Sequence, residues 1–353
     1  MTWLYWIAGI VIVLFSIAFA FIHQPSFGRL PSGERLERIK RSPNYRNGEF
    51  RNQHPTVLMT SQTSRVHAMW NFIFGKKGDI VPDSSVIAIK TDLKHLPIER
   101  DCMVWFGHSS YLLQLSGKRI LVDPVFSTGS PVTFINRPFP GTDIYEPDDM
   151  PDIDYLVISH DHWDHLDYRT IKQLKRRIRL VVCPLGVGEH FEYWGFSPEQ
   201  LVEMDWGERH TLDTNFLVVC YPARHFSGRG LTVNQSLWAS FLFDTPSSKV
   251  YIGGDGGYDT HFAEIGKQHR DIDLAILENG QYSESWRYIH TMPRQLEKIV
   301  RDVGARKTVT VHHSKFALSM HAWDEPLHNV ERLKRIDSLH VLSPQIGEVI
   351  YLD

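Results

Sequence analysis

Residues 157–167 read VISHDHWDHLD, and this stretch limits the fold more than any other part of the chain. Its apolar start is typical of a strand, and side chains two apart at a strand end point the same way. A turn after them carries the next acid and imidazole to a second point nearby. Imidazole nitrogens and carboxylate oxygens are ligands of zinc, iron or manganese. The H-x-H-x-D-H spacing therefore predicts a metal site, rather than a solvated polar loop, formed by His160, His162, Asp164 and His165.

Other segments offer the further ligands that two metal ions require. Three later apolar segments, PARH, GGD and TVTVHH, end in ligand-type side chains: His225, Asp255, and either His312 or His313. Within the first motif, Asp161 and Asp167 remain, and we expect them to orient ligating imidazoles. A lone histidine in any of these places would more often be structural, so the prediction depends on the set as a whole.

Five motifs together resemble those of a known family. They are VWFGHSSYLLQLSGKRILVDPVF, ISHDHWDHLD, PARHFSGRG, GGDGGY and HHSKFAL, which occur within about residues 100 to 320. Their types and order resemble the metallo-β-lactamase superfamily. Within it, they look like the group of the N-acylphosphatidylethanolamine-hydrolysing phospholipase D and its bacterial relatives. The motifs are highly specific for the fold and the metal site, and much less specific for the substrate.

The resemblance implies a fold and a site. The fold is α/β, a metallo-β-lactamase-like αβ/βα four-layer sandwich with two zinc ions at one edge, where iron or manganese is also possible. The implied ligands are His160, His162 and His225 for one ion, Asp164, His165 and His312 for the other, and Asp255 bridging both. The resemblance places His290 at the substrate pocket and Gly107, His108 and Asp123 beside the site. Relatives often carry an acid where this chain has Arg294, so the pocket, and with it the substrate, stays open.

The rest of the pattern indicates a mixed α/β domain without strict β-α-β alternation. Residues 103–126 are predicted to form two strands joined by a Ser-Gly-Lys turn, and residues 236–244 are predicted to pair with 249–255. Residues 291–304 have Pro in the first turn and Gly at the end, which predicts a helix. We divide the chain into a transmembrane anchor at 1–22, a tether and N-terminal extension at 23–95, and a metallo-β-lactamase-like hydrolase domain at 96–353.

The N-terminal run is different in kind. Residues 3–22, WLYWIAGIVIVLFSIAFAFI, carry no charge and at about 1.5 Å per residue are long enough to cross a bilayer. A cleaved signal peptide, with Ala18-Phe19-Ala20 at its end, is the alternative, but no Lys or Arg precedes the run. Basic residues after it predict a single-pass inner-membrane anchor with the catalytic domain in the cytoplasm. These residues are Arg29, Arg35, Arg38, Lys40 and Arg41.

Two segments between this run and the domain carry weaker signals. Residues 23–53 are polar and turn-rich, which predicts an extended tether with at most one short helix at 33–41. Residues 66–74 place apolar side chains on one helical face, and Lys76 and Lys77 follow. This pattern fits an interfacial helix lying on lipid, and equally a helix docked on the domain.

Composition excludes several classes of protein. The 353 residues carry a formal net charge of −3, so there is no global basic footprint and we predict no nucleic-acid partner. The three cysteines are far apart, which argues against a disulfide scaffold or a thiolate zinc site. Cys183 and Cys220 follow Val-Val pairs and are predicted to be buried, inert thiols.

Together these features predict a membrane-anchored, zinc-dependent phosphodiesterase of the phospholipase D type. Its expected substrate is a glycerophospholipid resembling N-acylphosphatidylethanolamine, attacked by a hydroxide that two metal ions generate from water. Asp164, Asp255 and His290 are the expected catalytic residues, and His290 either binds or protonates the substrate or is plain pocket wall. One alternative is a hydrolase of the same fold acting on a soluble substrate, such as a sugar-phosphate lactone or a thioester. Another is a metal-binding scaffold without turnover, against which the intact ligand set argues.

Overall fold

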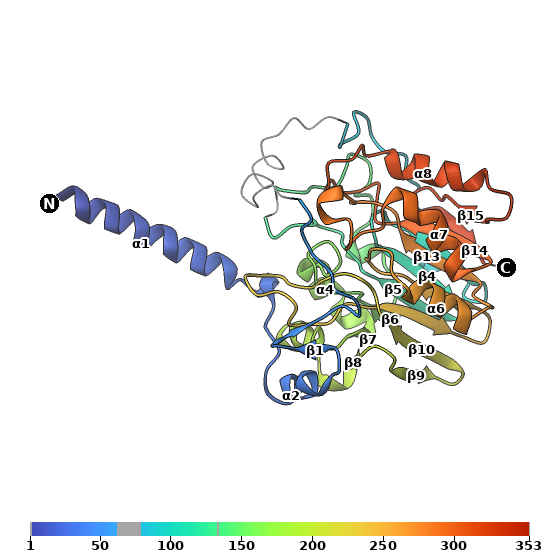
Figure 1. Cartoon of the computed structure of the whole chain (residues 1–353), viewed down its shortest axis with the longest axis horizontal. Coiled ribbons are helices and arrows are strands. Elements are labelled where there is room, and N and C mark those ends of the chain that lie inside the picture. Colours follow the sequence, from blue (N-terminus) through green and yellow to red (C-terminus); the bar gives the residue numbers. More distant parts are fainter. Residues whose placement is uncertain (1, 62–78, 133, 353) are drawn as a thin grey trace.

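The computed structural model describes residues 2–61, 79–132 and 134–352, which form an α/β sandwich of four layers (Figure 1). In this part of the chain two seven-stranded sheets pack face to face, and helices cover their outer faces. The αβ/βα four-layer fold predicted from the sequence is confirmed.

The first sheet has the strand order β16-β3-β4-β5-β6-β7-β8, and strands β5 to β8 run parallel. Residues 103–126 form three strands rather than the predicted two, while the predicted Ser-Gly-Lys turn is confirmed between β4 and β5. The apolar run is broken by a tight turn at Gly107 and His108, whose φ angles are +82° and +52°. The strands are β3 Cys102–Trp105, β4 Tyr111–Leu115, β5 Lys118–Val122, β6 Ile153–Val157, β7 Ile178–Pro184, β8 Leu201–Met204 and β16 Val349–Tyr351.

The second sheet has the order β15-β14-β13-β12-β11-β10-β9, and strands β12 to β15 run parallel. The predicted pairing across the TPSS turn is confirmed, since β11 and β12 are antiparallel neighbours. The strands are β9 Arg209–Asp213, β10 Phe216–Tyr221, β11 Ser240–Asp244, β12 Lys249–Ile252, β13 Leu274–Glu278, β14 Lys307–Val311 and β15 Val341–Leu342.

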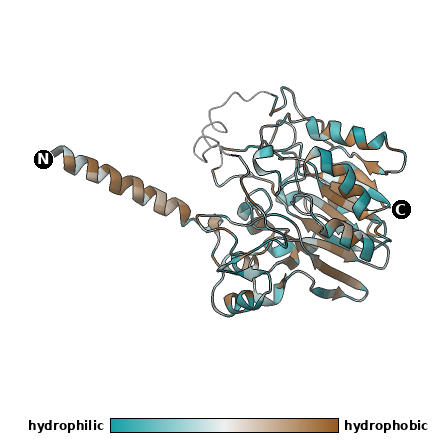
Figure 2. Ribbon diagram, viewed as in Figure 1, coloured by the Kyte–Doolittle hydropathy of each residue, from teal (hydrophilic) through white to brown (hydrophobic). Residues whose placement is uncertain are grey.

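The main core lies between the two sheets, where apolar residues of both inner faces are buried together. One further apolar cluster lies between each sheet and its covering helices. Figure 2 shows the strands largely in the hydrophobic colour and the helices over them partly in the hydrophilic colour. The predicted helix at 291–304 is α7, which begins at Pro293 and ends before Gly304, whose φ is +64°. The helices are α1 Thr2–Ile22, α2 Gly33–Arg41, α4 Tyr168–Leu174, α5 Gly188–Tyr193, α6 His261–Gln268, α7 Pro293–Val303 and α8 Glu325–Lys334.

The apolar run forms the helix α1, which projects away from the sandwich (Figure 1). Its stretch Trp3–Ile22 has the length and composition of a membrane span, and none of it is buried against the domain. A signal sequence meets the same test, so α1 is a candidate span.

The segment after α1 is folded onto the domain rather than extended as predicted, while the short helix predicted at 33–41 is confirmed as α2. Ile39 of α2 and Phe50 are fully buried in an apolar cluster with residues of the main domain. Arg35 of α2 forms ion pairs of 2.5 Å with Glu189 and 2.6 Å with Glu203, both nearly buried. The basic side chains that follow α1 therefore meet acids on the domain, which holds the segment in place.

Two other expectations concern the segment at 66–74 and the three cysteines. The amphipathic pattern at 66–74, with the two lysines after it, lies outside the described residues. The three cysteines are buried and free, and burial raises the pKa of Cys183 and Cys220 well above its usual range. The prediction of buried, inert thiols is confirmed.

Candidate metal centre

The loop after β6 holds the H-x-H-x-D-H motif at the carboxyl end of that strand. His160 Nε2 lies 2.8 Å from His162 Nδ1, and His225, which follows β10, places its Nε2 3.2 Å from the same His162 atom. These three imidazoles form one group whose ligand atoms all lie within 4.8 Å of one another. The sequence prediction groups the same three residues.

A second group lies beside the first. It joins Asp164 and His165 of the motif with His312, which follows β14, and with His108, which follows β3. His108 Nε2 lies 2.8 Å and His165 Nε2 3.5 Å from Asp164 Oδ2. The family resemblance places His108 only beside the site. In the structure, however, His108 Nε2 lies closer to Asp164 Oδ2 than the Nε2 atom of the expected ligand His165 does.

Asp255, at the end of the loop after β12, lies between the two groups. Its Oδ2 is 3.1 Å from His165 Nε2 and 3.2 Å from His312 Nε2, and it also forms a group with His160 and His165. Burial alone would raise the pKa of Asp255, but the His165 and His312 imidazoles outweigh it and hold the pKa well below its usual range. The carboxylate is therefore ionised and positioned as a bridging ligand would be.

The donor atoms fit divalent metal ions. Two nitrogens that share a tetrahedral zinc at about 2.0–2.1 Å lie about 3.3 Å apart. The 2.8 Å and 3.2 Å spacings around His162 are close to this value. Among the described residues, Asp255 Oδ1 and His108 Nδ1 are buried without a hydrogen-bond partner, and His312 Nε2 lies 3.2 Å from the Asp255 carboxylate without forming a hydrogen bond. A buried polar atom without a partner is costly, and a cation between the carboxylate and the imidazoles removes that cost.

The other ring nitrogens are held by partners that fix the rings. Asp123 Oδ2 lies 2.8 Å from His165 Nδ1, and Ser109 Oγ lies 2.9 Å from His312 Nδ1. His225 Nδ1 donates to a backbone carbonyl at 2.7 Å. Such contacts orient metal-ligating imidazoles and leave the opposite nitrogen for the metal.

The predicted orienting role of Asp161 and Asp167 is wrong. The Asp161 carboxylate is bound by the Gly228 N–H and lies 3.2 Å from His190 Nε2, on the far side of the loop. Asp167 accepts from the Arg169 N–H and caps α4. Asp161 lies next to His160 and His162 in the sequence, but the alternation of a strand end points its side chain away from theirs.

The structure groups His312, and not His313, with the candidate ligands. His313 turns inward, where its ring packs 4.9 Å from the Trp105 ring and Nδ1 lies 2.8 Å from Ser314 Oγ. His312 has a φ of +70°, a conformation that L side chains rarely adopt. Backbone hydrogen bonds from His312 N to His108 O and from His108 N to His313 O, 2.9 and 2.8 Å long, stabilise this turn.

His290 lies over the cluster, with its ring centroid 5.0 Å from that of His225 and 5.3 Å from that of His312. Its Nδ1 is 3.0 Å from Glu278 Oε2 at the end of β13. Burial lowers the pKa of His290, but the Glu278 carboxylate more than offsets this and the pKa is raised. Burial raises the pKa of Glu278 to about 7. Sequence reasoning missed Glu278, although an acid that ends the apolar segment LAILE has the same signal as Asp255. Arg294 is exposed and pairs with Glu284 at 2.7 Å.

The four-layer αβ/βα sandwich and the histidine and aspartate cluster at its strand ends fit the class of metal-dependent hydrolases. Residues 118–313 match the family described as the beta-lactamase superfamily domain, so the chain belongs to this superfamily. The predicted resemblance is confirmed.

Individual relatives agree with this assignment. The chain is 37% identical over 301 residues to an uncharacterized protein of Mycobacterium tuberculosis, covering 83% of this chain and 79% of that protein. It is 30% identical over 232 residues to N-acyl-phosphatidylethanolamine-hydrolyzing phospholipase D 1 of Caenorhabditis elegans, covering 61% of this chain and 64% of that protein. The crystal structure of Igni18, a metallo hydrolase of Ignicoccus hospitalis, shares the fold with a TM-score of 0.54 at 17% identity, covering 72% of this chain and 98% of that one.

Proposed function

We propose that this protein is a membrane-anchored, zinc-dependent phosphodiesterase of the phospholipase D type, acting on a glycerophospholipid resembling N-acylphosphatidylethanolamine. The observation that carries the proposal is the cluster of seven predicted ligands, in which Asp255 Oδ1 is buried without a hydrogen-bond partner among the described residues. The similarity to the Caenorhabditis elegans phospholipase D supports the substrate class.

In this proposal two zinc ions would be held by the predicted ligands. His160, His162 and His225 would hold one ion, Asp164, His165 and His312 would hold the other, and Asp255 would serve both. When bound, such a pair supplies a water of lowered pKa and offsets negative charge on the phosphodiester. His290 binds the substrate phosphate or donates a proton to the leaving alkoxide. Its Nδ1 is engaged by Glu278, so Nε2 is the nitrogen that remains for the substrate.

The proposed setting is the inner membrane, with α1 as a single-pass anchor and the domain in the cytoplasm. The basic residues after α1 support this orientation at the time of insertion. In the folded chain, Arg29 pairs with Glu189 at 2.6 Å and Arg38 with Glu208 at 2.9 Å. The same charges then hold the domain close to the end of α1, where a lipid substrate is concentrated.

The test is to incubate the zinc-loaded, full-length protein with mixed phospholipids and to identify the products by mass spectrometry. Release of phosphatidic acid that ends on chelation, and falls at least about 100-fold in Asp255→Asn, is expected, because the amide cannot replace the anionic bridge. Absence of phosphatidic acid from every lipid would refute the substrate class. Full activity in Asp255→Asn would refute the bridging role.

A second candidate function is hydrolysis of a soluble substrate by the same site. The identities to characterised lipid hydrolases are low, and Arg294 departs from the expected acid beside the pocket. Equal turnover of a soluble ester, lactone or thioester with and without lipid would favour this function over the first.

A further inference from the structure

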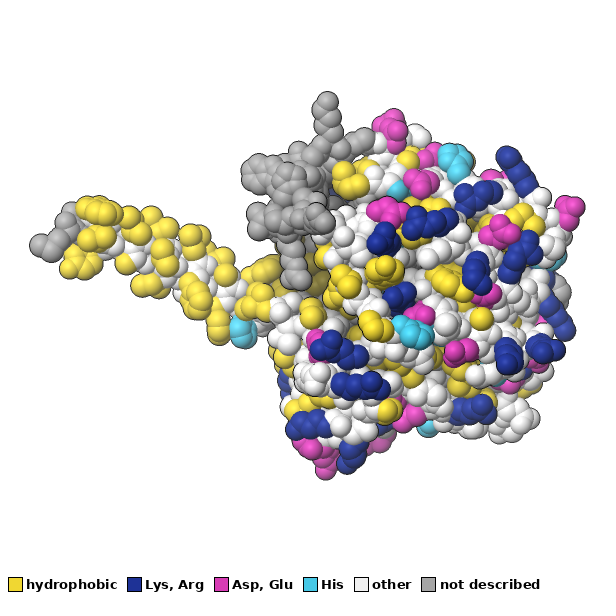
Figure 3. Space-filling model, viewed as in Figure 1, with side chains coloured by type: hydrophobic (Ala, Val, Ile, Leu, Met, Phe, Trp, Pro, Cys, Tyr) yellow, Lys and Arg dark blue, Asp and Glu magenta, His cyan; other side chains and the backbone are white. Residues whose placement is uncertain are grey.

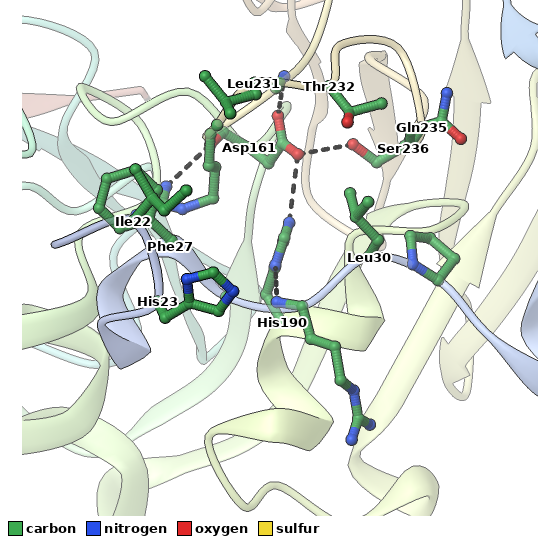
Figure 4. Close-up of a pocket in the computed structure, with 16 residues that line it drawn as sticks. Ile22, His23, Phe27, Leu30, Asp161, His190, Leu231, Thr232, Gln235 and Ser236 are labelled. Carbon is green, nitrogen blue, oxygen red and sulfur yellow. Dashed lines mark hydrogen bonds and ion pairs between the residues drawn. The ribbon is translucent and has the colours of Figure 1, made fainter. Parts of the chain in front are cut away.

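A cavity of about 320 Å³ lies at the end of α1, separate from the candidate metal centre (Figure 4). One wall is formed by the segment that leaves α1, including Ile22, Phe27 and Leu30. The opposite wall is the loop after β10, including Leu231 and Thr232. Figure 3 shows hydrophobic side chains continuing from α1 onto the domain surface at this junction.

The cavity is fixed relative to the end of α1 because the segment between them is held on both sides of Phe27. The Ser26 carbonyl accepts two hydrogen bonds from the Arg229 guanidinium, 2.8 and 3.1 Å long. The Arg29 N–H donates to His190 Nδ1 at 3.1 Å. Gly28 has a φ of +72°, and a Cβ there would lie 2.0 Å from His190 Nδ1. No flexible linker therefore separates the helix end from the cavity.

The charged and imidazole groups that line the floor are already engaged with one another. The Asp161 carboxylate is bound by Gly228 N–H at 2.7 Å, Ser236 Oγ at 2.7 Å and His190 Nε2 at 3.2 Å (Figure 4). The Arg229 guanidinium donates hydrogen bonds to backbone carbonyls of the neighbouring loops. A phosphate or carboxylate ligand would have to break these bonds, which disfavours a headgroup in the cavity.

The rim, in contrast, carries several apolar side chains that are open to solvent. The exposed fraction is 87% for Leu231, 52% for Leu30 and 39% for the neighbouring Val233. Large apolar side chains gathered at such exposure mark a binding or membrane surface. The volume is near the lower limit for small-molecule pockets, which suits one hydrocarbon chain rather than a whole phospholipid.

We propose that this cavity binds the hydrocarbon chain of a membrane lipid whose headgroup stays at the bilayer surface. The proposal rests on α1 being a membrane anchor, as in the proposed function, and not on the reaction that the metal centre performs. Because Ile22 ends α1 and also lines the cavity, an anchored helix holds the mouth at the boundary between the lipid chains and the headgroups.

The experiment uses the full-length protein in phosphatidylcholine vesicles that contain a phosphatidylcholine with a diazirine in its acyl chain. After irradiation, mass spectrometry locates the lipid adducts. We expect adducts on α1 and also on the peptides around Phe27 and Leu231. In Thr232→Trp, which fills the cavity, adducts on these two peptides are expected to fall about fivefold or more, while those on α1 stay unchanged. Ile87→Trp, at an exposed position that does not line the cavity, is the matched control and is expected to keep the normal pattern.

Three outcomes would overturn the proposal. Adducts on α1 but none around Phe27 and Leu231 would refute the cavity site alone. Absence of adducts from α1 as well would refute the anchor, and with it both this proposal and the membrane setting of the proposed function. A lipid with the diazirine in its headgroup, if it labelled the cavity more strongly than the acyl probe, would refute the hydrocarbon assignment. Phosphatidic acid release, measured in parallel, distinguishes failure of the proposed reaction from each of these.

Discussion

Arg229 connects the metal-binding loop to the segment after α1, and we expect its replacement by lysine to weaken metal binding. Its buried guanidinium donates to the carbonyls of Leu166 at 2.7 Å and Asp161 at 2.8 Å, both in the H-x-H-x-D-H loop. It also donates twice to the Ser26 carbonyl, and its Cζ lies 4.1 Å from the centroid of the Trp163 ring. One side chain therefore fixes the backbone on both sides of the candidate ligands.

The expected magnitude follows from these bonds. Lysine keeps the charge but has a single nitrogen instead of the planar fork, so it cannot reach the carbonyls of both segments at once. If two of these hydrogen bonds are lost at about 1–1.5 kcal/mol each, Arg229→Lys lowers the free energy of unfolding by about 2–3 kcal/mol. Mutating a residue that hydrogen-bonds to metal ligands without binding the metal itself typically lowers metal affinity about 10–100-fold. We expect the zinc affinity of Arg229→Lys to fall by about 10-fold, the lower end of this range.

The assay is competition for zinc between the full-length protein in detergent and a chromophoric chelator, together with urea unfolding. Arg177→Lys is the matched control, because Arg177 Nη1 also donates to backbone carbonyls, those of Pro147 at 3.0 Å and Met150 at 3.1 Å. These carbonyls precede β6, at the end opposite the metal loop. The control is expected to lose stability and keep its zinc affinity. An unchanged zinc affinity in Arg229→Lys, with the stability loss of the control, would refute the reasoning.

Three further predictions concern the cluster and its surroundings. His312→Gln is expected to lower the zinc content measured by elemental analysis, while His313→Gln keeps it; equal losses would contradict the ligand assignment. Asp123→Asn is expected to weaken zinc binding about 10–100-fold in chelator competition, because the carboxylate orients His165; wild-type affinity would show that this contact is dispensable. Burial lowers the pKa of Lys315 from 10.5 to about 8, so the unfolded chain binds more protons between these pH values and stability rises with pH there, by up to about 3 kcal/mol. Urea unfolding at pH 7.5 and 10 is expected to show this rise relative to Lys315→Met, and parallel changes in the two proteins would count against a buried, neutralised lysine.

The local parts of the site were predictable from the sequence. His160, His162, Asp164 and His165 lie within six residues at a strand end, so the alternation of the strand and one turn nearly fix their relative positions. The fully apolar run at 3–22 likewise has few alternatives to an exposed helix or a signal sequence. For these features the sequence positions alone allowed a correct prediction, because the residues that act together are close neighbours in the chain.

The distant parts depended on sheet order and on backbone conformations that sequence patterns do not encode. Glu278, which supports His290, reaches the site only because β13 lies between β12 and β14. His108 reaches Asp164 through a turn with positive φ inside an apolar run that resembles continuous strand.

The contacts around the H-x-H-x-D-H loop likewise depended on the tertiary structure. Asp161 looked like a support for its neighbouring imidazoles, yet it faces His190 and the segment that leaves α1. The sequence by itself determined the fold class, the candidate ligands and the apolar helix, because each is written in a short or periodic pattern. Only the tertiary structure decided which groups surround the ligands and how the N-terminal segment docks, because those contacts join separate elements of the chain, such as residues 42 positions apart for Asp123 with His165 and 203 positions apart for Ser26 with Arg229, and depend on how the layers pack.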